Sequence, residues 1–130
     1  MKKPKINMTV IKENKGYSAN ASIGNSFIAT EGDTFEHLKT NIMEAVSLTF
    51  EDKGFTYSID EIKFNYDLES FFDFYKVINA KALSERIGMN QSLMAQYIKG
   101  IKKPSPFQTK RILKGVQQIG KELSEVGFLI

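Results

Sequence analysis

The chain has 130 residues, 42% hydrophobic and 25% charged, with a net charge of +3; these proportions suit one or two folded domains and exclude a largely disordered chain. It contains no cysteine, which excludes a disulfide framework and any metal site built from thiolates. Its apolar runs are too short for a signal peptide or a membrane span, so we expect a cytoplasmic protein without a membrane partner.

Alternation of apolar and polar residues predicts three short strands at the start of the chain. Ile6, Met8 and Val10 alternate with polar residues within 5–11, and the pattern recurs in 17–23. Turn residues lie on both sides of this second segment, and a third segment at 26–30 follows. We therefore expect two successive hairpins that form an antiparallel meander.

A helical pattern then replaces the alternation. Six apolar residues are spaced for one helix face: Phe35, Leu38, Ile42, Ala45, Val46 and Phe50. Asp33 and Glu36 have the spacing of a capping box, and Gly54 follows the last periodic residue, which predicts a helix over about 34–53. A fourth alternating segment at 62–66 completes a β-β-β-α-β domain with the helix over one face of its sheet.

Residues 67–130 carry helical patterns only. We expect a helix capped by Asp67, short helices at 80–87 and 91–98, and a long helix capped by Ser105. The long helix has an apolar face formed by Phe107, Ile112, Val116, Ile119, Leu123 and Val126. The predicted fold class is thus α+β, with a small antiparallel β-β-β-α-β domain over 1–66 and an all-α domain over 67–130.

Charge is unevenly divided between these two predicted domains. Residues 1–66 carry eight Lys and Arg against nine Asp and Glu, whereas residues 67–130 carry ten against six. The segment from Arg86 to Lys121 holds eight basic residues and no carboxylate. This asymmetry predicts two domains with different partners, and the basic domain favours a polyanion, most simply nucleic acid.

The two short helices, separated by Gly88 and two further residues, predict a helix-turn-helix. Its apolar seam comprises Ala82, Leu83, Ile87, Met89, Met94 and Tyr97. The candidate DNA-binding residues are Gln91, Ser92, Gln96, Lys99, Lys102 and Lys103, with Lys110, Arg111 and Lys114 as further phosphate neighbours. Leu93 could contact a thymine methyl group or pack inside. A small helical bundle with a solvated basic face and no DNA partner would show the same pattern of basic and apolar residues.

The segment "ALSERIGMNQSLMAQYIKGIKKPS", residues 82–105, resembles the helix-turn-helix of the Cro/repressor family. The shared features are Gly88, the pair Gln91 and Ser92, and the "KG…KKPS" ending at Ser105. That family often has Glu-Asn before its closing glycine, where this chain has Ile98 and Lys99. The resemblance implies double-stranded operator DNA as a partner, read over two half-sites by a homodimer or higher homo-oligomer.

The run from Gly32 to Leu38, "GDTFEHL", followed by "NIMEAV" at 41–46, resembles the HicB antitoxin family. Typical members have a longer, proline-containing loop before the third strand, where this chain has "IGNSF". The resemblance implies a partial RNase H-like fold for the first domain. It also implies an antitoxin that blocks a small HicA-like, mRNA-cleaving toxin and represses its own operon through the helix-turn-helix.

We expect no enzymatic activity, no metal and no cofactor. A nuclease of the RNase H type needs several carboxylates around two metal ions, but the three predicted strands contain none and Glu36 and Glu44 lie about two helical turns apart. His37 is the only histidine, and the glycines at 16–24 lack the spacing of a phosphate loop. The alternative function is a stand-alone DNA-binding transcription regulator whose first domain dimerises or senses a ligand.

Overall fold

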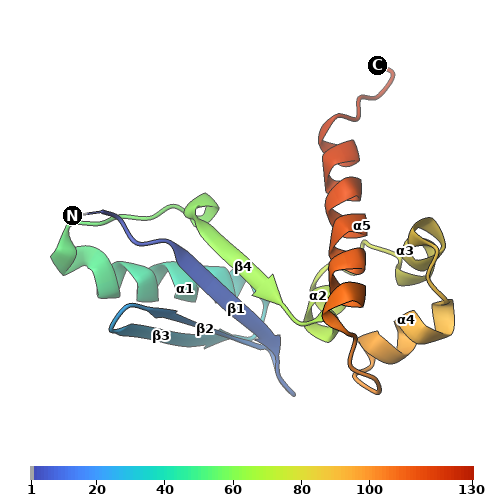
Figure 1. Ribbon diagram of the computed structural model, residues 1–130. Helices are drawn as coiled ribbons and strands as arrows, with labels where there is room; N and C mark the ends of the chain where they lie inside the picture. The colour runs from blue at the N-terminus through green and yellow to red at the C-terminus, as the bar shows by residue number, and fades with distance from the viewer. Residues whose placement is uncertain (1) are drawn as a thin grey trace. The chain divides into compact units, whose positions relative to one another are not determined.

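A computed structural model describes residues 2–130 and has an α+β fold, as expected (Figure 1). The chain divides into two compact units, of which the first ends at Phe74 and the second begins at Tyr75. The sequence had suggested a boundary at 66/67. Within the described residues, no helix is both long enough and apolar enough to cross a membrane.

The first unit contains a four-stranded sheet in the order β3-β2-β1-β4. Its strands are β1 (Ile6–Lys12), β2 (Tyr17–Ile23), β3 (Ser26–Gly32) and β4 (Ile62–Tyr66). The three-strand meander is antiparallel as predicted, but β4 runs parallel to β1, with Ile6 opposite Ile62. The expectation of an entirely antiparallel sheet is therefore wrong. The cause is the helical crossover between β3 and β4, which returns the chain to the end of the sheet where β1 begins.

One helix, α1 (Phe35–Phe50), covers a face of this sheet (Figure 1). Its buried side chains Leu38, Ile42, Val46 and Phe50 form one core with the inward-facing residues of the strands. The helix is capped by Thr34, whose hydroxyl accepts a hydrogen bond from the His37 amide, whereas Asp33 had been expected at that position. The short 3-10 helices Glu51–Lys53 and Ile59–Glu61 lead from α1 to β4.

The helix α2 (Leu68–Phe74) belongs to the first unit because it bonds to the end of β1 and the start of β2. The backbone amide of Lys12 donates to the hydroxyl of Ser70 at 2.8 Å, and the Tyr17 hydroxyl donates to Asp73 at 2.6 Å. The ring of Phe74 stacks on Tyr17 with 4.7 Å between centroids. These contacts explain why the division falls after Phe74.

The second unit contains α3 (Ala80–Ile87), α4 (Gln91–Ile98) and α5 (Pro106–Ser124). Its buried core comprises Leu83, Ser84, Met89, Met94, Tyr97 and Ile112. Gly88 ends α3 with φ 71°, a conformation that glycine adopts without strain. Gly115 brings α5 close to α3, since a Cβ atom there would lie 2.6 Å from Cγ2 of Ile87.

Candidate nucleic-acid interface

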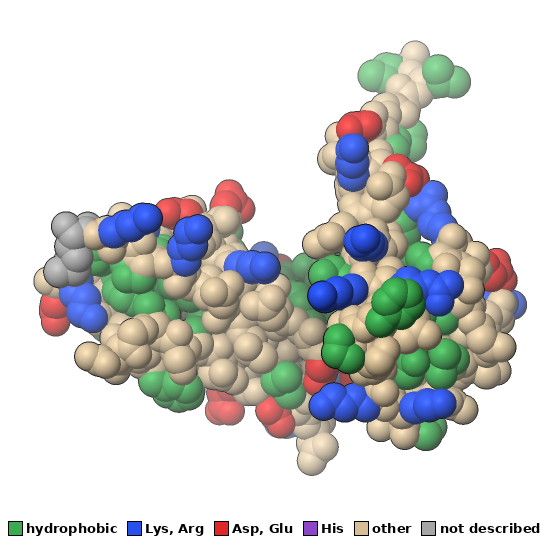
Figure 2. Space-filling model, viewed as in Figure 1, with side chains coloured by type: hydrophobic (Ala, Val, Ile, Leu, Met, Phe, Trp, Pro, Cys, Tyr) green, Lys and Arg blue, Asp and Glu red, His purple; other side chains and the backbone are tan. Residues whose placement is uncertain are grey.

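The charge asymmetry is larger between the structural units than between the predicted domains. The first unit, through Phe74, carries eight Lys and Arg against twelve Asp and Glu, a net of −4. The second unit, from Tyr75, carries ten against three, a net of +7. Figure 2 shows Lys and Arg side chains spread over the helices of the second unit. A unit of this charge attracts polyanions over a range set by the ionic strength.

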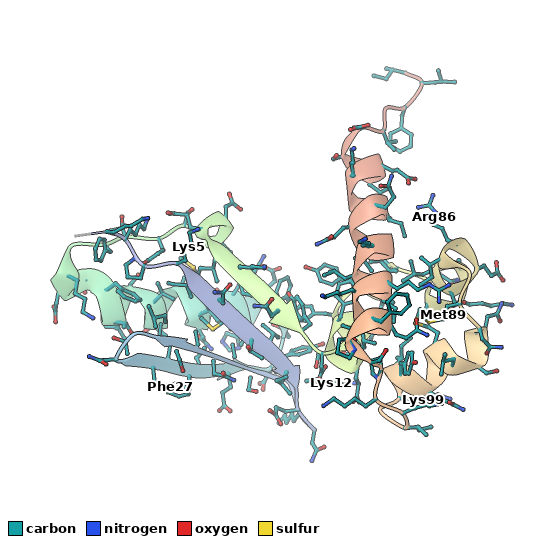
Figure 3. All side chains as sticks on the ribbon, in the orientation of Figure 1. Lys5, Lys12, Phe27, Arg86, Met89 and Lys99 are labelled. Carbon is teal, nitrogen blue, oxygen red and sulfur yellow. The ribbon has the colours of Figure 1, made fainter. Side chains whose placement is uncertain are left out.

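The orientation of α4 follows from its buried side. Met94 and Tyr97 are buried, which turns the opposite face of the helix to solvent. Ser92, Gln96 and Lys99 lie on that face because they are spaced i, i+4 and i+7. Figure 3 shows Lys99 at the end of α4 and Met89 in the turn before it. The helix thus presents a hydroxyl, an amide and an ammonium group side by side. Together they can donate to phosphates, and they can both donate to and accept from base edges.

All six predicted DNA-binding side chains are exposed: Gln91, Ser92, Gln96, Lys99, Lys102 and Lys103. The structure brings Ser92, Gln96 and Lys99 together on one face of α4, with Gln91 at its flank and the two remaining lysines in the following loop. Leu93 is half-buried, so its burial does not decide between contact with a thymine methyl group and packing inside the unit.

Gln91 has an internal partner that the sequence did not suggest. Its side-chain amide donates to the carboxylate of Glu85 at 2.8 Å. The carboxylate-free segment begins at Arg86, but the turn at Gly88 returns the chain so that Glu85 lies beside the first residue of α4. The Gln91 amide nitrogen is therefore held by a carboxylate, while the residue as a whole stays exposed.

Arg111 has a structural role that the sequence did not suggest. Its guanidinium donates to the carbonyl oxygens of Ile87 at 2.8 Å and of Gly88 at 2.9 Å, and its side chain is half-buried. These carbonyls end α3, where a cation also favours the negative end of the helix dipole. The neighbouring Lys110 and Lys114 are exposed on α5 and remain candidates for phosphates.

The loop between α4 and α5 has a defined backbone. The amides of Ile101 and Lys102 both donate to the carbonyl of Gln96, at 3.0 and 3.3 Å, and Gly100 has φ 74°. This closure holds Lys102 next to the end of α4. Ser105 then caps α5 by accepting from the amide of Gln108.

Two apolar side chains near this loop are exposed, Ile101 at 72% and Phe107 at 74%. Phe107 had been assigned to the apolar face of the long helix. It precedes Ile112 by five residues, about 140° around the helix, so it projects away from that face. A closer reading of this spacing would have separated Phe107 from the other apolar residues of α5.

Comparison with known proteins found no matching family model, no matching curated protein and no matching solved structure.

Proposed function

We propose that the second unit is a helix-turn-helix that binds double-stranded DNA with α4 as its reading helix. The observation that carries this proposal is the outer face of α4, where Ser92, Gln96 and Lys99 lie together on a unit of net charge +7. A merely solvated basic face would need no cluster of polar side chains suited to base edges. The major groove is about 12 Å wide and admits one helix, so α4 can enter it while α3 crosses behind.

Each side chain has a role that its chemistry supports. Gln96 can bond bidentately to an adenine edge, and Ser92 can bond either a base or a phosphate. Lys102 and Lys103, in the ordered loop, lie on the neighbouring phosphates and release counterions on binding. Gln91, whose amide nitrogen already bonds to Glu85, offers its carbonyl oxygen to a donor such as the cytosine amino group.

The experiment is selection of duplexes from a random-sequence pool by the full chain, followed by gel-shift titration of the enriched sequence and a scrambled duplex at 150 mM salt. We expect an enriched motif that binds at least about 1,000-fold more tightly than the scrambled duplex. Equal affinity for the two duplexes would contradict the proposal, because it would leave only charge-driven binding.

We further propose that the whole protein is a HicB-like antitoxin that binds a small HicA-like toxin through its first unit and represses its own operon. The sequence resemblance of 32–46 supports this proposal, and so does the open edge of the sheet at β3. An edge strand offers unpaired N–H and C=O groups to a partner strand. Phe27, labelled in Figure 3, is 66% exposed on this edge strand and would add apolar contact.

Mass spectrometry of proteins that co-purify with the native chain tests this second proposal. We expect a small basic protein in stoichiometric amount, whose ability to cleave mRNA is lost in the complex. Purification of the chain without such a partner, combined with specific DNA binding, would favour the alternative of a stand-alone regulator.

A further inference from the structure

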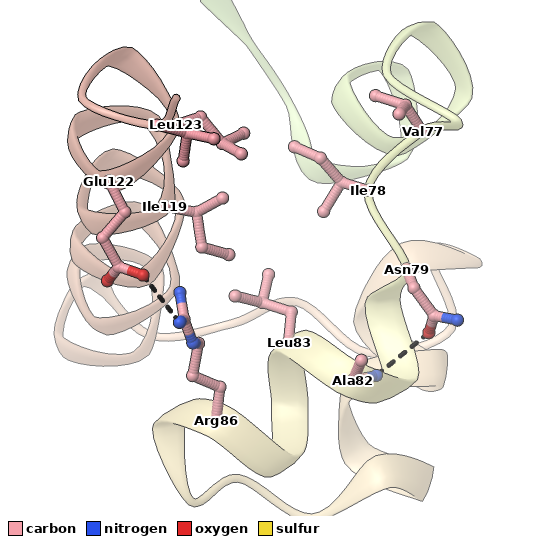
Figure 4. A pocket seen from close by; sticks show the side chains of 10 residues that line it. Val77, Ile78, Asn79, Ala82, Leu83, Arg86, Ile119, Glu122 and Leu123 are labelled. Atoms are coloured by element: carbon pink, nitrogen blue, oxygen red, sulfur yellow. Dashed lines mark hydrogen bonds and ion pairs between the residues drawn. The ribbon is translucent and has the colours of Figure 1, made fainter. Parts of the chain in front are cut away.

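An apolar groove lies between the long helix of the second unit and the residues that lead into α3. Its volume is about 400 Å³, and Ile78, Leu83, Ile119, Leu123 and Val126 are among the residues that line it. Figure 4 shows Ile78 facing Ile119 and Leu123 across the open space. The groove is thus apolar on both walls and lies outside the polar face of α4.

The apolar residues of α5 repeat with the spacing of a helix-pairing seam. Ile112, Val116, Ile119 and Leu123 follow one another at intervals of four, three and four residues, and Val126 comes three residues later, just beyond the end of α5. This is the 3.5-residue period by which one helix packs along another. In this unit α3 and α4 cover only the beginning of the seam, and Figure 1 shows the end of α5 extending past both helices.

Exposure rises along the seam accordingly. Ile112 is 1% exposed, whereas Leu123 is 66% and Val126 is 54% exposed. Val77, which also lines the groove, is 89% exposed, and three apolar residues of the segment after α5 are at least 88% exposed: Phe128, Leu129 and Ile130. At roughly 150–200 Å² for each whole residue, these six residues together expose on the order of 900 Å², which is similar to one side of a standard protein interface.

The charges around the groove favour a second copy of this chain over a polyanion. Two of the three carboxylates of the second unit, Glu122 and Glu125, lie at this end of α5 beside Lys121. At the rim, Arg86 donates to Glu122 at 2.8 Å, and this guanidinium, together with Gln118, lowers the pKa of Glu122. A rim that carries both signs, with its principal pair already neutralised, does not repel an identical rim.

We infer that the end of α5 and the groove beside it form a homodimer interface, in which each copy places its Leu123 and Val126 against the same segment of its partner. Such an interface is isologous, with the two-fold axis near the centre of the exposed seam at Leu123. Self-association through this interface does not depend on DNA binding and can be measured without DNA. It also supplies the pairing by which two copies of α4 could read two half-sites.

Analytical ultracentrifugation of the full chain, without DNA, tests this interface with a matched pair of substitutions. Leu123→Lys places a charge in the seam, whereas Gln117→Lys adds the same charge to an exposed position about 140° from Ile112 around the helix. We expect a wild-type dimer at 100 µM, an unchanged dimer for Gln117→Lys, and a dissociation constant raised on the order of 100-fold for Leu123→Lys, because each copy loses a buried leucine. A monomeric wild type, or a dimer unaffected by Leu123→Lys, would overturn the inference.

Cross-linking gives a second test that does not depend on the lysine variant folding. The chain contains no cysteine, so Leu123→Cys and Gln117→Cys each provide a single thiol. We expect mild oxidation to convert Leu123→Cys to a covalent dimer at least ten times faster than Gln117→Cys. Equal rates would refute this interface, while failure of the duplex selection with the dimer intact would refute only the proposed DNA binding.

Discussion

Arg111 offers a test that separates a structural arginine from a phosphate-binding one. Its two hydrogen bonds to the carbonyls of Ile87 and Gly88 hold the end of α3 against α5. A hydrogen bond from a charged donor contributes about 1.5–3 kcal/mol when it is well buried. Because Arg111 is only half-buried and water can partly replace it, we expect Arg111→Gln to reduce the free energy of unfolding of the second unit by about 2 kcal/mol in total.

The assay is thermal unfolding followed by circular dichroism, with hydrogen exchange of peptides from 80–98 to locate the loss. For a unit of this size, about 2 kcal/mol corresponds to a midpoint roughly 8–16 °C lower. The matched control is Lys110→Gln, which removes the same charge from an exposed neighbour. It should leave the midpoint unchanged and reduce the slope of log K against log[salt] for DNA binding by about 0.9. The reasoning would be refuted if Arg111→Gln left stability intact and reduced the salt slope instead.

Three further predictions concern α4, the loop that follows it and the first unit. Gln96→Ala should cost about 1–3 kcal/mol of affinity for the selected duplex and relax its preference at one base pair, as measured by gel shift; unchanged affinity would remove α4 as the reading helix. Substituting both Lys102 and Lys103 by alanine should weaken binding to all duplexes alike and reduce the salt slope by about 2, so a loss confined to the selected duplex would contradict their role. The hydrogen bond to Asp73 and, second, burial raise the pKa of Tyr17 from 10.0 to about 12. This hydroxyl therefore stabilises the folded first unit fully below pH 10 and loses that contribution as the pH rises from 10 to 12. Tyr17→Phe should therefore diminish the fall in denaturant midpoint between pH 9 and pH 12, and an identical fall in both proteins would refute the assignment.

The sequence predicted most elements of the fold because local patterns carry them. Alternation identified β1 and β2, and helix caps located α3, α4 and the start of α5 at Ser105. The direction of β4 could not be derived in this way, since its pairing with β1 joins residues more than fifty positions apart. The third strand also extends to Gly32 and so includes Glu31, although the predicted strands contained no carboxylate.

The candidate interface shows the same division between local and non-local information. Exposure of Ser92, Gln96 and Lys99 follows from the helical period alone once Met94 and Tyr97 are buried. Net charge along the chain could not show that Arg111 bonds to the end of α3, because that contact spans twenty-three residues. It also could not show that Glu85 folds back onto Gln91.

The most direct measurement of the central claim is a ¹H–¹⁵N NMR titration of the full chain with the selected duplex. If α4 reads DNA, the largest amide shifts should fall between Gln91 and Lys103. The strands β1–β4 should not contact the duplex, so their amide signals should not shift through direct contact. Shifts concentrated in the sheet of the first unit, with none in α4 or the following loop, would contradict the account.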